Sequence, residues 1–409
     1  MALSRGASEG MDVAAAPASV PRPAEPLWTP NYIVLLFSVH SHFASWFMLV
    51  ATLPLYVEDK PDWQIGFVVG SIGISSVLVR PFTGRWVDRF GRRPFLIAGA
   101  AMVAASLVAY SVSDALPALV AVRLFHGVGM ALFTTAGLAM AADIAPASRR
   151  GEAMGYFAMV NSASQIYAPA IGFLIADRFG FAPMFFFGAA SATAALAGAL
   201  TLREPEREQA AGASGLFAVS ALAPCLVFLA LTATMGGVQA FLPLMAEDRG
   251  LGNPGLFFTL FGVALVLNRV YAGRIADVHG RGAIIAPGLL LTSATMAGLA
   301  FVDARWLFLL LALAFGTAFA MGHTGLLALV VDRSSATERG AAMAMFALTW
   351  DVGAALGSLA LGVVLDLTTF SAVYLLTSMF SVAALALFLA RLPAGRAALP
   401  DAAMPARGG

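Results

Sequence analysis

From about residue 30 to residue 391 the sequence alternates long apolar runs with short polar loops, and this alternation constrains the fold more than any other feature. A helix that crosses a bilayer needs about 20 mostly apolar residues, because lipid offers no partner for an exposed backbone polar group. Charged residues make up 11% of the chain, whereas about a quarter of the residues in a soluble domain are charged. We therefore expect a membrane protein whose solvent is the lipid bilayer.

Twelve apolar runs qualify as spanning helices, which predicts an all-α membrane protein. Their expected bounds are 30–57, 63–83, 94–113, 116–143, 151–176, 182–202, 216–246, 255–272, 284–303, 306–331, 340–365 and 370–391.

A charged ten-residue phrase occurs twice in this apolar chain, as GRWVDRFGRR from Gly84 and as GRIADVHGRG from Gly273. The offset is 189 residues (273 − 84), and the same offset relates Asp143 to Asp332. A constant offset across six spans predicts two pseudo-symmetric six-helix bundles. Transporters built from such repeats hold substrate between them near the bilayer midplane and rock one half against the other.

The repeat also sets the expected domain organisation. A disordered tail (1–29), an N-terminal bundle (30–202), a polar linker (203–215), a C-terminal bundle (216–391) and a second tail (392–409) follow in this order. If the N-terminus is cytoplasmic, the inner loops hold twelve Arg residues, and the outer loops hold one Lys and three Arg. The positive-inside bias therefore predicts that both tails and the linker are cytoplasmic. We expect the membrane to be a bacterial-type inner membrane.

Two further features of the composition exclude classes of function. A net charge of +1 gives no reason to expect a nucleic-acid partner, and the single Cys225 excludes an internal disulfide and a Cys-based metal cluster. His40 and His42 are two residues apart and face different directions on a helix, so they do not support a metal site.

Three motifs carry a family resemblance. Motif A, G-x-x-x-D-R/x-x-G-R-R/K, is matched by Gly84, Asp88, Arg89, Gly91, Arg92 and Arg93, and more loosely by Gly273, Asp277, Gly280 and Arg281. Motif B, R-x-x-x-G-x-G-x-A, is matched by Arg123, Gly127, Gly129 and Ala131, and motif C survives as APAIG with Pro169 and Gly172. Over about 30–391 the sequence resembles the major facilitator superfamily, and motifs B and C resemble its drug–proton antiporters and related efflux permeases.

The resemblance implies that motif A forms a cytoplasmic gate. Asp88, expected in a short loop, would dock near Arg339–Gly340 when the cytoplasmic side is closed, and Asp277 would dock near Arg150–Gly151 by repeat symmetry. The alternative is a solvated turn that only anchors the topology.

Two charged residues fall within expected spans. Arg123 should face the interior because a guanidinium in hydrocarbon is costly, although it could instead extend to the interface. Asp351 lies 11 residues past Gly340, which is about 16 Å along a helix. We expect Asp351 to carry a proton with Arg123 as its counter-charge; the alternative is a structural ion pair.

Several polar residues near the expected midplane complete the candidate site. His40, His126 and His323 could assist Asp351 in proton coupling, because imidazole titrates near neutral pH, although each could instead be a hydrogen-bonded packing residue. The substrate cavity is expected to include Arg123, His42, Asn161, Gln165, Tyr167, Gln239 and Trp350. Close helix packing is expected at Gly127, Gly129, Pro169, Gly172, Gly353 and Gly357.

The combined interpretation is a secondary active transporter that works by alternating access. Proton-coupled export of a small organic or amphipathic molecule is the first hypothesis, and proton-coupled uptake of a metabolite or nutrient is the second. A receptor or scaffold that does not transport is a third. No phosphate-binding Gly-Lys loop occurs, so we do not expect ATP as the energy source. We also expect no enzymatic activity, no cofactor and a monomer.

Overall fold

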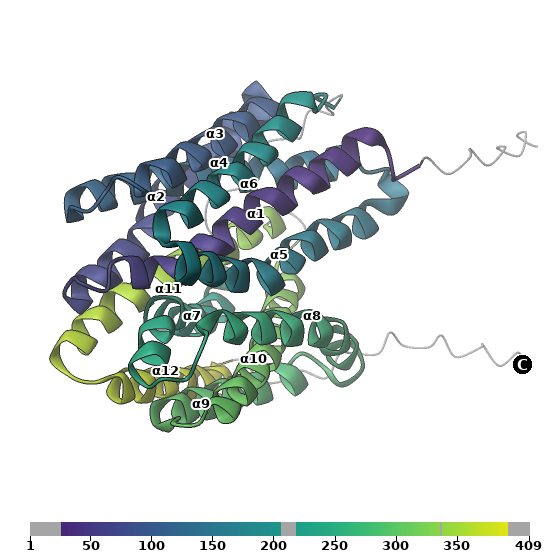
Figure 1. The fold of residues 1–409 in the computed structure, drawn as a ribbon. Coiled ribbons are helices and arrows are strands. Elements are labelled where there is room, and N and C mark those ends of the chain that lie inside the picture. The colour runs from purple at the N-terminus through teal and green to yellow at the C-terminus, as the bar shows by residue number, and fades with distance from the viewer. Residues whose placement is uncertain (1–25, 206–217, 336–337, 392–409) are drawn as a thin grey trace, which may run out of the picture.

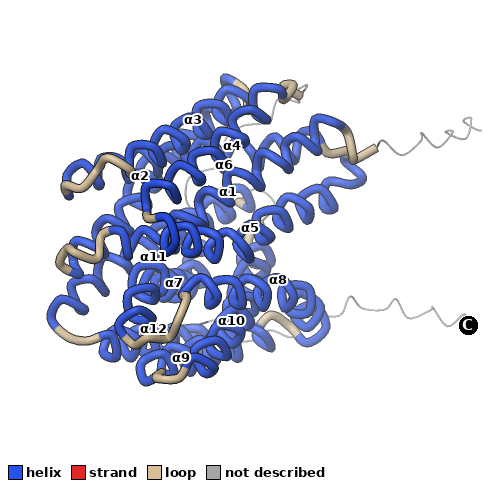
Figure 2. The backbone as a smooth tube through the Cα atoms, viewed as in Figure 1, coloured by secondary structure: helices blue, strands red, loops and turns tan. Residues whose placement is uncertain are grey.

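A computed structural model describes residues 26–205, 218–335 and 338–391. Most of the expected linker and of the two expected tails therefore lies outside the described residues. Within these residues the chain forms twelve long helices and no strand, so the predicted all-α fold is confirmed (Figure 2).

The helices follow the two predicted sets of six. The first set is α1 (Pro30–Tyr56), α2 (Asp62–Phe90), α3 (Arg93–Tyr110), α4 (Leu116–Ile144), α5 (Arg150–Phe179) and α6 (Phe181–Thr201). The second set is α7 (Leu222–Asp248), α8 (Pro254–His279), α9 (Gly282–Phe301), α10 (Arg305–Arg333), α11 (Arg339–Leu367) and α12 (Phe370–Arg391). Short 3-10 turns, Ala147–Arg149 and Val219–Ala221, precede α5 and α7.

Each set forms one bundle with the same internal packing (Figure 1). In the first bundle α1 packs on α5 and α6, α4 packs on α2 and α3, and α3 packs on α6. In the second bundle every one of these pairs recurs with the helix number raised by six. The starts of α3 and α9, at Arg93 and Gly282, keep the 189-residue offset (282 − 93).

The two bundles meet mainly through α2 against α11 and α5 against α8. Near the start of α2, a Cβ placed on Gly66 would meet the backbone of Ser358 and lie 3.1 Å from Cα of Gly362. Near the start of α8, a Cβ on Gly255 would lie 2.7 Å from Cα of Ala170. The bundles are therefore in backbone contact at this end, which we call the opposite end.

The other end, called the motif A end, carries the two repeated charged phrases. A Cβ placed on Gly84, Gly151, Gly155 or Gly273 would meet nothing within 4 Å. The start of α1 lies at the same end, because the Asn31 side chain donates to the carbonyl oxygen of Arg203 (3.1 Å), just after α6. The bundles therefore touch at the opposite end and separate at the motif A end.

Helices α2 and α8 are longer than the sequence predicted. They continue past residues 83 and 272, and they end only where Gly91 and Gly280 adopt φ values of 106° and 88°. A positive φ is readily available only to glycine, and it terminates the helix. The expectation that Asp88 lies in a loop was wrong, since Asp88 and Asp277 lie in the last helical turns.

Eleven of the described helices are long and apolar enough to span a membrane, and α5 is the exception among the twelve. It has 30 residues, so its length suffices, but polar side chains such as Asn161, Ser162 and Gln165 interrupt its apolar character. These three side chains line a cavity between the bundles. The low hydropathy of α5 is thus explained by the site that it helps to build.

The expected packing glycines lie at close helix contacts. A Cβ on Gly127 would meet α2, one on Gly129 would meet α3, and one on Gly172 would meet α1. Added Cβ atoms on Gly353 and Gly357 would both meet α7. Pro169 is buried inside α5.

A Gly66→Ala substitution should destabilise the fold, because the new methyl group meets backbone that cannot rotate away. We expect a loss of about 1–3 kcal/mol, as is typical of overpacking. Cys225, the only cysteine and 4% exposed, can report unfolding through its reaction with a fluorogenic maleimide during heating. Gly84→Ala is the matched control with open space around it; equal melting temperatures for the two variants would contradict the expectation.

Candidate functional site: a charged cavity between the bundles

A cavity of about 530 Å³ lies between the two bundles. Helices α1, α2, α4 and α5 line it from one bundle, and α7, α8, α10 and α11 line it from the other. Its aromatic wall, as we call it, consists of Phe43, Trp46, Phe47, Phe261, Phe319 and Trp350. A volume of this size suits a small organic molecule, because ligand pockets typically span about 300–1,000 Å³.

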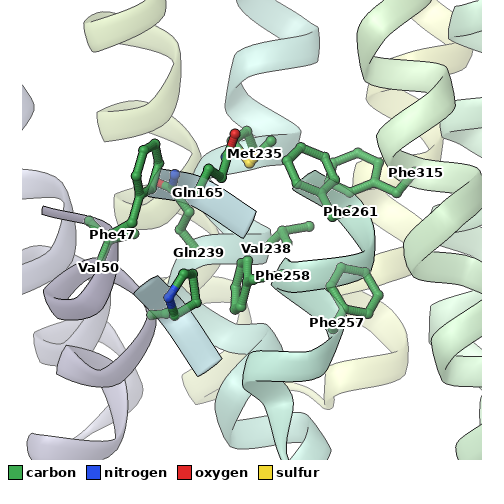
Figure 3. A pocket seen from close by; sticks show the side chains of 12 residues that line it. Phe47, Val50, Gln165, Met235, Val238, Gln239, Phe257, Phe258, Phe261 and Phe315 are labelled. Atoms are coloured by element: carbon green, nitrogen blue, oxygen red, sulfur yellow. The ribbon is translucent and has the colours of Figure 1, made fainter. Parts of the chain in front are cut away.

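A second, tightly packed pocket adjoins the cavity and shares Phe47, Gln165 and Gln239 with it (Figure 3). Gln165 and Gln239 lie beside Phe47, and Phe257 and Phe258 lie below them in this view. The space left among these side chains is about 10 Å³, roughly the room of one water molecule. These side chains therefore leave little room between the cavity and the opposite end.

One ion pair crosses the cavity between the bundles. Nε of Arg80 on α2 lies 2.7 Å from Oδ2 of Asp351 on α11, although its N–H does not point at that oxygen as in a well-formed hydrogen bond. The hydroxyl of Ser76 donates to the same oxygen at 2.9 Å. Asp351 therefore has Arg80 as its counter-charge, and the expectation that Arg123 fills this role was wrong.

Arg123 lies on the cavity but is almost completely buried, with 1% of its surface exposed. Its Cζ lies 5.3 Å from the ring centroid of Trp46, a distance at which a guanidinium is attracted to an aromatic face. One Nη donates to the carbonyl oxygen of Val69 at 3.3 Å. Nε and the other Nη have no hydrogen-bond partner among the described residues.

The candidate histidines occupy different surroundings. His323 lines the cavity and lies between Phe319, Trp350 and other rings. His126 is buried, with Nδ1 3.5 Å from the hydroxyl of Tyr110. Neither His40 nor His126 is among the described residues that line the cavity.

His42 and Tyr167 differ from their expected place in the cavity. His42 is fully buried and stacks on Phe133, with ring centroids 3.7 Å apart. The hydroxyl of Tyr167 lies 2.7 Å from Nε2 of His40, at the contact of α5 with α1. Both side chains point away from the cavity because a helix turns about 100° per residue, so neighbours in sequence face different sides.

The remaining expected cavity residues, Asn161, Gln165, Gln239 and Trp350, do line it. The sequence interpretation missed Ser76, Arg80 and Arg269. The sequence did contain a signal for the two arginines, because Arg80 and Arg269 occupy equivalent positions of the 189-residue repeat (269 − 80). Their depth was hidden because the two helices were predicted to end too early.

The motif A end carries two matching charge networks. Arg92 lies 3.2 Å from Asp88 and donates from Nε to Asp143 at 2.8 Å. In the second bundle Arg281 contacts Asp277 and donates from Nε to Asp332 at 2.8 Å. The backbone N–H groups of Arg92 and Arg93 donate to Glu204, at 2.7 and 2.9 Å. Each network ties the last turn of one helix to the end of another helix of its own bundle.

The guanidinium of Arg281 illustrates the strength of these networks. Hydrogen bonds to Asp332 and Asp277 raise the pKa of Arg281 above its ordinary value, because both carboxylates favour the charged form. Arg92 contacts carboxylates, whereas the guanidinium of Arg89 lies over an aromatic ring, with its Cζ 5.3 Å from the ring centroid of Phe90.

A profile of the Major Facilitator Superfamily matches residues 35–268 and 222–406. This chain belongs to that superfamily. As a Major Facilitator protein it is a multi-pass membrane protein.

Named relatives of this Major Facilitator protein include two from Bacillus subtilis (strain 168). Multidrug resistance protein 1 is 34% identical over 143 residues, which cover 35% of this chain and 37% of the relative. Multidrug resistance protein 2 is 31% identical over 176 residues, which cover 42% of this chain and 44% of the relative. The matches thus span less than half the length of each relative.

The fold is similar to that of a solved bacterial homologue of the human lysosomal transporter Spinster, in an inward-facing and occupied conformation. The TM-score is 0.77 at 13% identity, covering 90% of this chain and 97% of the other.

The ion pair of Arg80 and Asp351 should show energetic coupling. Removing either charge alone leaves the other charge with a partial desolvation penalty, so Arg80→Gln and Asp351→Asn should each cost about 1–3 kcal/mol. The double variant should be more stable than the sum of the two losses predicts. Thermal unfolding followed through Cys225 measures this; strictly additive losses would contradict the coupling. The exposed pair of Arg149 and Glu152 is the control, with a coupling of about 0–1 kcal/mol.

Proposed function

We propose that this protein exports a small organic or amphipathic molecule across the inner membrane of a bacterium, driven by the proton gradient. The observation that carries the proposal is an interbundle ion pair, Arg80–Asp351, inside a cavity with an aromatic wall. The motif A end faces the cytoplasm in this proposal, as the distribution of Arg and Lys in the loops favours. The cavity then loads substrate from the cytoplasm.

Asp351 is the proposed proton carrier. When it is ionised, its attraction to Arg80 joins α2 to α11 across the bundle interface. Protonation removes the negative charge and weakens this contact, so a local change of charge shifts the equilibrium between two arrangements of the bundles. His323 is the second candidate because it lines the same cavity; His40 and His126 would act only through neighbours.

The two motif A networks are the proposed cytoplasmic gate. Arg92 and Arg281 hold Asp88 and Asp277 at the ends of α2 and α8. When the motif A end closes, Asp88 would approach Arg339 at the start of α11, where the helix dipole favours a negative charge. Asp277 would approach Arg150 at the start of α5 in the same way.

Export is favoured over uptake by the names of the two Bacillus subtilis relatives, which are multidrug resistance proteins. Uptake remains the second hypothesis, because alternating access can run in both directions with the same cavity. A cationic dye, a neutral dye and an anionic dye offered to proteoliposomes of known orientation, with an imposed pH difference, test transport and its direction. No proton-driven movement of any dye in either direction would contradict the proposal.

An Asp351→Asn variant should lose proton-driven transport but retain substrate binding and exchange, because the amide mimics the neutral acid. Net flux under a pH difference and counterflow without one can be measured on the same proteoliposomes. If the variant still concentrates dye under a proton gradient alone, Asp351 is not the carrier. The control is Asp303→Asn, in an exposed loop at the opposite end.

An Asp88→Asn variant should lower transport by about tenfold, a cost of about 1.4 kcal/mol in the rate-limiting closure. Substrate binding to the open cavity should change little, since Asp88 is not one of the described residues that line it. Initial rates of dye transport and equilibrium dye binding separate the two effects. Unchanged rates would favour the alternative that motif A only anchors the topology.

A further inference from the structure

The contacts between the two bundles follow the same 189-residue repeat as the sequence. On one side, a Cβ on Gly73 of α2 would lie 2.6 Å from Cβ of Ala355 on α11. On the other side, a Cβ on Gly262 of α8 would lie 3.2 Å from Cα of Ile166 on α5. Gly262 is the repeat equivalent of Gly73 (262 − 73 = 189), and Ala355 is the repeat equivalent of Ile166 (355 − 166 = 189). The α2–α11 and α8–α5 interfaces therefore share the same close contact at equivalent positions of the repeat.

The charged residues at these two interfaces are not equivalent in the same way. Arg80 on α2 has the carboxylate of Asp351 at 2.7 Å. Its equivalent on α8 is Arg269, and the equivalent of Asp351 on α5 is Ser162 (351 − 189). Arg269 and Ser162 both line the cavity. Arg269 makes no ion pair or side-chain hydrogen bond with any residue in the described ranges.

The cavity consequently has an excess of positive charge. Its described lining contains three arginines, Arg80, Arg123 and Arg269, and a single acid, Asp351. Asp351 offsets Arg80, and Arg123 is held over Trp46. Arg269, like Arg80, is only partly buried, but it has no acid beside it among the described residues, so its guanidinium is the one available to a ligand in the cavity. A cation removed from bulk water without a partner is costly, and a ligand oxyanion would supply that partner.

We propose that the transported molecule is an amphipathic organic anion whose carboxylate or similar oxyanion pairs with Arg269. A planar guanidinium presents two parallel N–H donors to such a group. The apolar part of the ligand packs against the aromatic wall on both bundles. This inference rests on the proposed transport function and names its substrate class.

Matched probes test the charge preference on the full-length protein in nanodiscs. Dansylglycine carries a carboxylate, dansylglycinamide is its neutral amide, and dansylcadaverine carries an ammonium. Energy transfer from the protein's tryptophans to bound dansyl gives each dissociation constant. We expect dansylglycine to bind at least about tenfold more tightly than the amide, as one charge-assisted contact would provide.

Two variants examine Arg269 itself. Arg269→Gln should remove the preference for dansylglycine over its amide. Ser162→Asp should have the same effect, because it gives Arg269 the acid that Arg80 already has. Arg274→Gln removes an exposed charge from the same helix, outside the described cavity lining, and should retain the preference.

The results that would overturn the inference are equal affinity for acid and amide, tighter binding of dansylcadaverine, or a preference that survives Arg269→Gln. Aryl carboxylates, sulfonates and phosphates at millimolar concentration should also raise the melting temperature reported by Cys225, and failure of all of them would overturn it equally. Proton-driven movement of a cationic or neutral dye without anion preference would defeat this inference and leave the transport proposal standing. Anion binding without any flux of anions or other dyes would defeat the transport proposal and leave only the pairing of Arg269 with a bound anion.

Discussion

No water reaches the backbone inside the hydrocarbon core, and this constraint determines most of the structure. Every spanning segment must satisfy its own N–H and C=O groups, so the chain is a set of helices. The same constraint makes each charged side chain at membrane depth costly unless it has a partner or faces a cavity. Arg80, Arg123, Arg269 and Asp351 all lie along the space between the bundles. The fold is therefore apolar where it meets lipid, and its intramembrane charge is concentrated in one cavity.

The sequence predicted the fold well because the relevant signals are long. Apolar runs of about 20 residues and a repeat that covers six spans leave few alternatives, and even α5, with its polar interruptions, was assigned. The ends of α2 and α8 were harder to predict, because a charged segment reads as a loop although it can continue a helix. Only the positive φ of Gly91 and Gly280 ends these helices, and backbone conformation is not visible in composition.

The site was predicted less completely because side-chain direction depends on helix rotation and on neighbouring helices. Asn161, Gln165, Gln239 and Trp350 face the cavity, whereas His42 stacks on Phe133. A depth estimate along one helix cannot distinguish these cases. The partner of Asp351 comes from α2 of the other bundle, and such a pairing across 271 residues of sequence (351 − 80) follows only from the packing of the bundles.

The glycine contacts at the opposite end form a point about which the two bundles can rotate, which we call the fulcrum. Gly66 and Gly362 meet without interlocking side chains, so the helices can pivot there with little steric resistance. From Gly66 to Arg89 at the far end of α2 is a lever of about 35 Å, at 1.5 Å per residue. A tilt of roughly ten degrees at the fulcrum would displace the motif A end by about 6 Å on this length. In the proposed alternating-access cycle, a small rotation at the opposite end would thus produce a large displacement at the motif A end.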